Sequence, residues 1–178
     1  PVKSYWRCRN DACEETFEGA FPTELHTEGS QLFKSQKIFI SYGHDQNTEL
    51  VKELKTRLEK AGHQIWIDYE QIDKAQDWRY QITKGIRESD RVLSFLSKHS
   101  VRDPGVCLDE IGIALSDRHG AIATLLVEPE NEVKAPASVS HIQYFNLSNW
   151  REKREQGDAV WQTWLDEQGR QILEIIAR

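Results

Sequence analysis

The chain of 178 residues is long enough for one domain of ordinary size with a short additional segment, and too short for two complete enzymes. Hydrophobic residues make up 38% and charged residues 29%, which is typical of a globular protein with a packed core. The net charge of −6 disfavours a nucleic-acid partner, because an acidic surface repels the phosphate backbone. We therefore expect a folded acidic domain with no nucleic acid bound.

The sequence also argues against membrane insertion and export. No apolar run reaches the roughly 18 to 20 residues that a membrane span needs, and the first residues are too polar for a signal peptide. Three cysteines fit a reducing compartment better than a disulfide-stabilised secreted domain. We expect a cytoplasmic protein without membrane contact, and a natural chain that extends upstream of Pro1.

Residues 1–36 differ from the rest of the chain. They lack a hydrophobic period, are rich in glutamate and contain the close pair Cys8 and Cys13. Together with His26, this pair could form part of a zinc site, but a structural zinc needs four ligands, commonly in two close pairs. Free thiols are the favoured interpretation and zinc the alternative. We expect an N-terminal segment, or the end of an upstream domain, with no cofactor.

From residue 37 onward, apolar runs of strand length alternate with helical patterns. The runs lie at 38–42, 64–67, 91–96, 121–127 and 142–147 and are rich in β-branched and aromatic residues. Helical spacing is found at Leu50, Leu54 and Leu58, at Trp78, Ile82 and Ile86, at Leu108, Ile111 and Leu115, and from Trp161 to Ile176. This pattern predicts an α/β domain over residues 37–178, with an open, five-stranded, mainly parallel sheet covered by helices on both faces.

Four segments of this domain resemble, in order and spacing, the sequence boxes of a TIR (Toll/interleukin-1 receptor) domain of the bacterial type. They are KIFISYGHD at 37–45, IWIDYEQIDKAQDWRYQI at 65–82, RVLSFLS at 91–97 and VCLDEIGIAL at 106–115. The resemblance implies a flavodoxin-like fold. It also implies one of two functions: an enzyme that cleaves NAD+ at the nicotinamide–ribose bond, or a non-catalytic adaptor that works through TIR–TIR contacts. A fold alone does not choose between them.

The resemblance makes Glu110 the catalytic residue, because it lies three residues after Cys107 in the last box. Helical geometry places Glu110 about 100° or more from the stripe of Leu108, Ile111 and Leu115, which predicts that it leaves the core face. A solvated helix glutamate is the alternative. We favour an NAD+ glycohydrolase or ADP-ribosyl cyclase acting in bacterial defence or stress responses.

Three further residues are expected near the substrate. The resemblance implies that Trp78, after the second strand, stacks on the nucleotide, with core packing as the alternative. Tyr42 ends the first strand at the same edge of the sheet, and Cys107 lies in the same box as the glutamate, with simple packing as its alternative. Val106 departs from the family pattern, because many enzymatic relatives have tryptophan four residues before the glutamate.

Two loops complete the expectations. Gly43 and His44 stand where some family members carry basic residues, which argues against a phosphate clamp in this loop and keeps the adaptor alternative open. The resemblance makes the loop with Asp68, Tyr69, Glu70, Gln71 and Ile72 an assembly loop, which packs on a neighbouring TIR domain and activates the site. An ordinary solvated loop is the alternative. The expected partners are therefore NAD+ and other TIR domains.

Overall fold

The computed structural model describes residues 6–7, 16–17, 34–67, 78–102, 105–117, 121–134 and 144–177. The chain divides into two compact units, Pro1–Lys34 and Ser35–Arg178. In the first unit, β1 (Trp6–Arg7) pairs in antiparallel fashion with β2 (Thr16–Phe17). The candidate zinc ligands Cys8, Cys13 and His26 lie outside the described residues.

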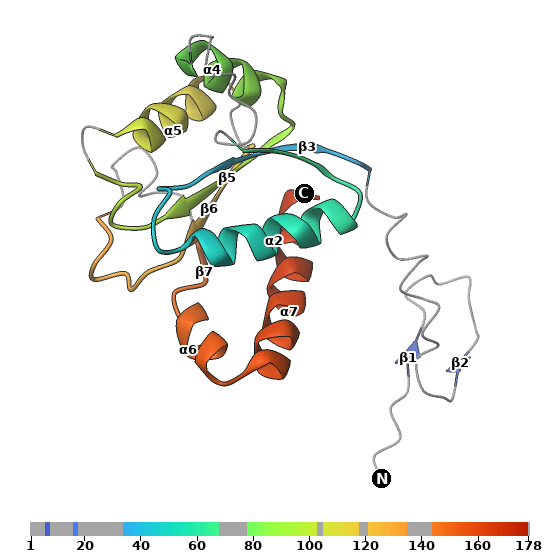
Figure 1. The fold of residues 1–178 in the computed structure, drawn as a ribbon. Coiled ribbons are helices and arrows are strands. Elements are labelled where there is room, and N and C mark those ends of the chain that lie inside the picture. The colour runs from blue at the N-terminus through green and yellow to red at the C-terminus, as the bar shows by residue number, and fades with distance from the viewer. Residues whose placement is uncertain are drawn as a thin grey trace. The chain divides into compact units, whose positions relative to one another are not determined.

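The second unit contains a five-stranded parallel sheet (Figure 1). Its strands are β3 (Lys37–Ser41), β4 (Gln64–Ile67), β5 (Arg91–Leu96), β6 (Ile122–Leu126) and β7 (Phe145–Asn146). They lie in the order β4-β3-β5-β6-β7, and every neighbouring pair is parallel. The predicted flavodoxin-like sheet is confirmed. The chain moves outward from β3 to β4 and then crosses to β5, so the strand order reverses between β3 and β5.

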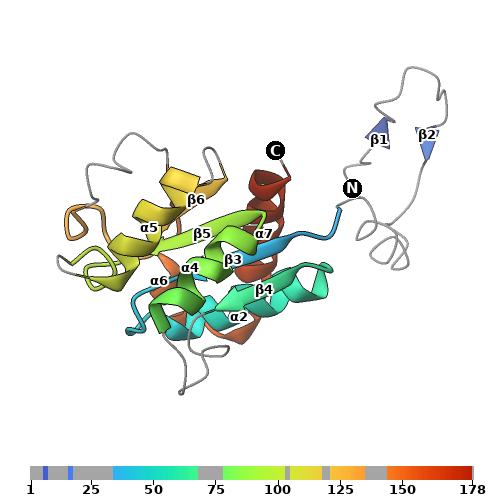
Figure 2. The ribbon, with the colours of Figure 1, turned by 90° about the horizontal axis from the view of Figure 1, so that it is seen from above.

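Helices cover both faces of this sheet (Figures 1 and 2). On one face lie α2 (Thr48–Lys60), α6 (Trp150–Glu155) and α7 (Asp158–Ile176), and on the other lie α4 (Trp78–Glu88) and α5 (Val106–Asp117). None of the helices in the described part of the chain is long and apolar enough to cross a bilayer.

The alternation of side chains along β3 explains this layering. Ile38 and Ile40 are buried in the cluster that contains the α2 and α7 side chains, whereas Phe39 packs with α4 residues on the opposite face. Helix α2 buries Leu50, Val51, Leu54 and Leu58, the predicted stripe, and the chain turns after it at Gly62, whose φ is +91°.

The short helix α6 is absent from the sequence prediction, because six residues do not establish a helical period. Its first residue, Trp150, is buried against Trp161 of α7, with ring centroids 6.0 Å apart. The Trp150 indole Nε1 also donates a hydrogen bond to Asn47 Oδ1 at 3.2 Å. This contact ties the C-terminal helices to the loop that follows β3.

Candidate functional site

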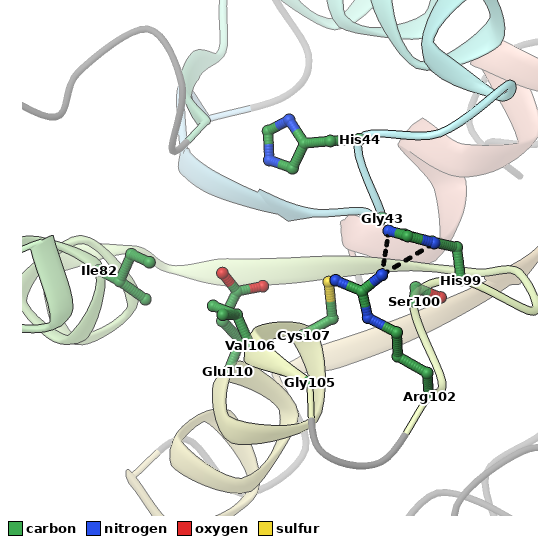
Figure 3. Close-up of a pocket in the computed structure, with 10 residues that line it drawn as sticks. All are labelled: Gly43, His44, Ile82, His99, Ser100, Arg102, Gly105, Val106, Cys107 and Glu110. Carbon is green, nitrogen blue, oxygen red and sulfur yellow. Dashed lines mark hydrogen bonds between the residues drawn. The ribbon is translucent and has the colours of Figure 1, made fainter.

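A cavity of about 450 Å³ lies beside the carboxyl ends of β3 and β5, where the strand order reverses (Figure 3). Four segments line it: the loop after β3, helix α4, the loop after β5 and the first turns of α5. The lining residues are Gly43, His44, Ile82, His99, Ser100, Arg102, Gly105, Val106, Cys107 and Glu110. Its size and its place in the sheet are those of a small-molecule site in an open α/β fold.

Glu110 is the carboxylate of this cavity and is only 3% exposed. Ser41 Oγ, at the end of β3, donates a hydrogen bond to Glu110 Oε2. The carboxylate therefore has a fixed orientation and is shielded from bulk water. Low solvent access strengthens its electrostatic interaction with any charge that develops in the cavity.

The prediction that Glu110 leaves the core face of its helix is wrong. Helix α5 buries Glu110, Ile111 and Ala114, while Leu108 and Leu115 are only partly buried. The reason is that α5 packs on two sides. Ala114 belongs to the cluster with α4 and β3 residues, whereas Ile111 belongs to the cluster with β5 and β6 residues, so the buried arc is wider than one stripe.

Tyr42 lies on the other face of the sheet from Ser41, as strand alternation requires. Its side chain is 5% exposed and belongs to the core cluster with α2 and α7 residues, and it is not among the lining residues of the cavity. Its ring lies 4.4 Å from that of His44, centroid to centroid. The structure therefore places the Tyr42 ring in the core rather than in the cavity wall.

Cys107 and Glu110, both from the last sequence box, line the same cavity. Cys107 is half-buried, and its Sγ donates a hydrogen bond to the Tyr42 carbonyl oxygen at 3.3 Å. Trp78 begins α4, but its side chain lies outside the described part of the structure. The proposed assembly residues Asp68, Tyr69, Glu70, Gln71 and Ile72 also lie outside it.

Sequence reasoning missed three polar residues of the site: Ser41, His99 and Arg102. The guanidinium of Arg102 lies against the His99 ring, with Nη1 at 3.0 Å from Nδ1 and 2.6 Å from Nε2 (Figure 3). His99 and Arg102 lie in the loop after β5. The rule that ligands bind at the carboxyl ends of the strands around a reversal of strand order points to this loop, and could have identified them.

A hydrogen-bond network fixes the loop after β3, which forms one wall of the cavity. Asp45 Oδ1 accepts from the Asn47 backbone N–H at 2.8 Å, and Asp45 Oδ2 accepts from Ser97 Oγ at 2.5 Å. At Gly43, a Cβ atom would lie 3.0 Å from Ser100 N and 3.1 Å from His99 Cδ2. The absence of a side chain there allows the two loops to approach each other.

Glu128, two residues after the end of β6, completes this network. Its Oε1 accepts from Asn47 Nδ2 at 3.0 Å, and its Oε2 accepts from the Lys98 backbone N–H at 2.9 Å. Burial raises the pKa of Glu128, but these hydrogen bonds, together with one from Gln46, outweigh burial and hold the pKa below its usual value. The ends of β3, β5 and β6 are thus joined through one buried carboxylate.

A second cavity, of about 660 Å³, lies between α4 and α5 and shares Ile82, Val106 and Glu110 with the first. Its further lining includes Arg79 and Asp109. Within the described residues, no group of three or more His, Cys, Asp and Glu side chains could hold a metal ion.

These features define a flavodoxin-like α/β domain with a carboxylate-bearing cavity where its strand order reverses. A family model described as "TIR domain" matches residues 38–168, so the chain belongs to the TIR domain family. The TIR identification from the four sequence boxes is thereby confirmed.

Solved structures with the same fold include two that cover most of this chain. The TIR domain of the Toll-related receptor TRR-2 from Hydra magnipapillata is 20% identical, with a TM-score of 0.54 over 75% of this chain and 97% of that one. A prokaryotic SEFIR domain is 19% identical, with a TM-score of 0.56 over 81% of this chain and 100% of that one. At these identities the likeness concerns the fold alone. A search of the curated proteins gave no significant match.

Proposed function

We propose that this TIR domain cleaves NAD+ at the nicotinamide–ribose bond and that Glu110 is its catalytic residue. The observation that supports this most strongly is the position of Glu110. It is a carboxylate with 3% exposure that lines a small-molecule cavity and is oriented by Ser41. A glutamate kept only for helix solubility would face solvent, as Asp109 does.

The chemistry requires only one carboxylate. Ordinary glycosidases use an acid to protonate the departing oxygen and a second carboxylate on the other side of the sugar. Nicotinamide is cationic in NAD+ and departs neutral, because the electrons of the broken C1′–N bond return to its ring nitrogen. Positive charge then develops on the ribose, where the Glu110 carboxylate stabilises it. Water attacks C1′ and releases a proton, giving ADP-ribose, whereas attack by an atom of the adenine end gives a cyclic product.

The alternative function is a non-catalytic adaptor that acts through TIR–TIR contacts, including interference with host signalling. One surface feature favours protein contact in either case: Tyr80 on α4 is 63% exposed, and aromatic side chains are enriched in interfaces. For the enzyme, we propose action in the bacterial cytoplasm, in defence or stress responses, with the 68–72 loop contacting a neighbouring copy.

The proposed function is tested by the change Glu110→Gln, which keeps the shape of the side chain but removes its charge. Nicotinamide release from NAD+ should fall at least about a hundredfold, the loss typical when a preorganised electrostatic contact to the transition state is removed. The assay should use concentrated protein, so that any assembled state is populated, and should separate the products by chromatography.

Asp109→Asn is the matched control, because it removes the same charge from the neighbouring, exposed position on α5. This variant should retain activity, and both variants should melt as cooperatively as the wild type. Equal turnover by Glu110→Gln and wild type would exclude Glu110 as the catalytic residue. Absence of turnover in the wild type at high concentration would favour the adaptor.

A further inference from the structure

The two charged side chains of the 450 Å³ cavity come from different elements. Among its described lining residues, Glu110 is the one carboxylate and Arg102 the one permanently charged cation. In the view of Figure 3, the Glu110 carboxylate and the Arg102 guanidinium lie on opposite sides of Cys107. A ligand that spans this cavity therefore meets a negative group from α5 and a positive group from the loop after β5.

Arg102 is available to an anion. Its side chain is exposed, and no salt bridge joins it to a carboxylate among the residues that the structure describes. Its hydrogen-bond partner is His99, which has to accept through a ring lone pair because a guanidinium only donates. This contact uses one terminal nitrogen and leaves the other N–H groups of the guanidinium for a ligand.

The first turn of α5 adds partial positive charge to the part of the cavity that Arg102 lines. Gly105, Val106 and Cys107 line the cavity at the N-terminal end of this helix, where the aligned peptide dipoles place partial positive charge. A planar guanidinium beside a helix N-terminus suits a phosphate better than a neutral sugar or an apolar group.

We propose that Arg102, held in position by His99, binds the phosphate groups of a nucleotide ligand in this cavity. This inference rests on the proposed function for the identity of the ligand, and it adds which residues hold the diphosphate of NAD+ while the ribose next to nicotinamide lies at Glu110. It also supplies a cation from the loop after β5, whereas Gly43 and His44 stand in the loop after β3 at the positions where some family members carry basic residues.

The test measures binding without turnover. Dissociation constants of ADP-ribose, which carries the diphosphate, and of adenosine, which does not, are measured by calorimetry or NMR titration on the full chain. Arg102→Gln should weaken ADP-ribose binding roughly ten- to hundredfold, the value of a charge-assisted hydrogen bond, and should leave adenosine binding unchanged. The matched control is Arg170→Gln on α7, which removes the same charge where the arginine pairs with Glu167 and Glu174.

His99 is tested as a positioning residue by two variants. His99→Leu removes the acceptor and should weaken ADP-ribose binding in the same direction as Arg102→Gln. His99→Asn keeps an acceptor oxygen for the guanidinium and should restore most of the affinity. If the role of His99 were purely structural, His99→Leu would weaken the binding of adenosine and of ADP-ribose alike. His99→Asn would then give no selective recovery of ADP-ribose binding.

The outcomes separate this inference from the proposed function. Unchanged ADP-ribose affinity in Arg102→Gln, or an equal loss in Arg170→Gln, overturns the phosphate site even if the wild type cleaves NAD+. Absence of ADP-ribose binding to the wild type overturns it as well. Selective loss of ADP-ribose binding in Arg102→Gln supports it, even if Glu110→Gln and wild type show the same NAD+ turnover.

Discussion

Ser41 and Tyr42 show what the sequence allows at the scale of single residues. A strand alternates its side chains, so neighbours at the end of β3 have to face opposite sides of the sheet. Ser41 accordingly reaches Glu110, and Tyr42 enters the α2–α7 core. The strand end could be predicted from sequence, but the face of the sheet that borders the cavity could not, because it depends on where α5 packs.

His63 is a residue for which pH should change stability. It is 6% exposed, its Nδ1 accepts from the Gln36 backbone N–H at 3.3 Å, and its Nε2 is buried without a hydrogen-bond partner. Burial lowers its pKa below the usual value of 6.5. The unfolded chain therefore takes up a proton near pH 6.5, while the folded protein does so only at lower pH. The free energy of unfolding is therefore not reduced by His63 above pH 6.5. It decreases as the pH falls from 6.5 toward the folded pKa, because protonation then favours the unfolded chain.

His63→Asn isolates this effect, because asparagine offers an acceptor oxygen near the position of Nδ1 and does not titrate. We expect the wild type to lose more free energy of unfolding than His63→Asn between about pH 7 and pH 5, in urea titrations at each pH. Parallel loss in the two proteins would show that His63 takes up its proton over the same pH range in the folded and the unfolded protein, so that burial does not change its pKa.

At the scale of elements, helix α4 reaches the site because a glycine lets it approach β4. A Cβ atom at Gly85 would lie 2.8 to 3.0 Å from ring atoms of Trp66, which stacks on Phe39 with centroids 4.7 Å apart. The rigid, stacked indole has little freedom to move aside. This contact sets the height of α4 above the sheet, and with it the position of Ile82 in the cavity wall.

Two glycines in neighbouring helices should therefore respond in opposite ways to alanine. A Cβ atom at Gly112 in α5 would have no atom within 4 Å, so Gly112→Ala should raise the free energy of unfolding by about 0.5 to 1 kcal/mol through helix propensity. Gly85→Ala gains the same propensity but overpacks Trp66 at a cost of about 1 to 3 kcal/mol, so it should be destabilising.

Chemical denaturation of both variants beside the wild type measures these free energies. Stabilisation by both alanines would mean that α4 shifts away from β4 without cost. In that case Gly85 does not determine the position of the helix.

The elements themselves were largely predictable, for identifiable reasons. The β3, β5 and β6 runs are almost continuously apolar, as strands covered on both faces have to be. The two-residue strand β7 and the short helix α6 carry too little pattern to define their bounds. For α5, the spacing predicts a helix but not its buried arc, because neighbours on two sides decide that arc.

At the scale of the whole molecule, the hydrophobic clusters found among the described residues lie between Ile38 and Ile176. The unit Ser35–Arg178 thus contains its own core. Its last helix is part of that core, since α7 buries Trp161, Leu165 and Ile172. The end of α7 is also joined to β5, where Arg91 Nε donates to the Ile176 carbonyl oxygen at 2.9 Å.

Removing residues 1–34 should therefore leave the melting temperature of the remaining unit within a few degrees of the full chain, as measured by circular dichroism. Removing residues 157–178 is the contrasting deletion. Each fully buried large side chain of α7 contributes about 1.5 to 3 kcal/mol, so the loss of several is comparable to the whole stability of an ordinary domain and should unfold it. A large drop in melting temperature for the first deletion would show that residues 1–34 support the fold of the second unit.

Val106 lies where the two cavities beside α5 meet. Together with Ile82 and Glu110 it borders both cavities, of about 450 and 660 Å³, and it is 37% exposed. A bulky residue at this position would partition the two spaces, and a smaller one would merge them. We therefore expect the volume of this one aliphatic side chain to govern which ligands the proposed site admits, independently of the Glu110 carboxylate one helical turn away.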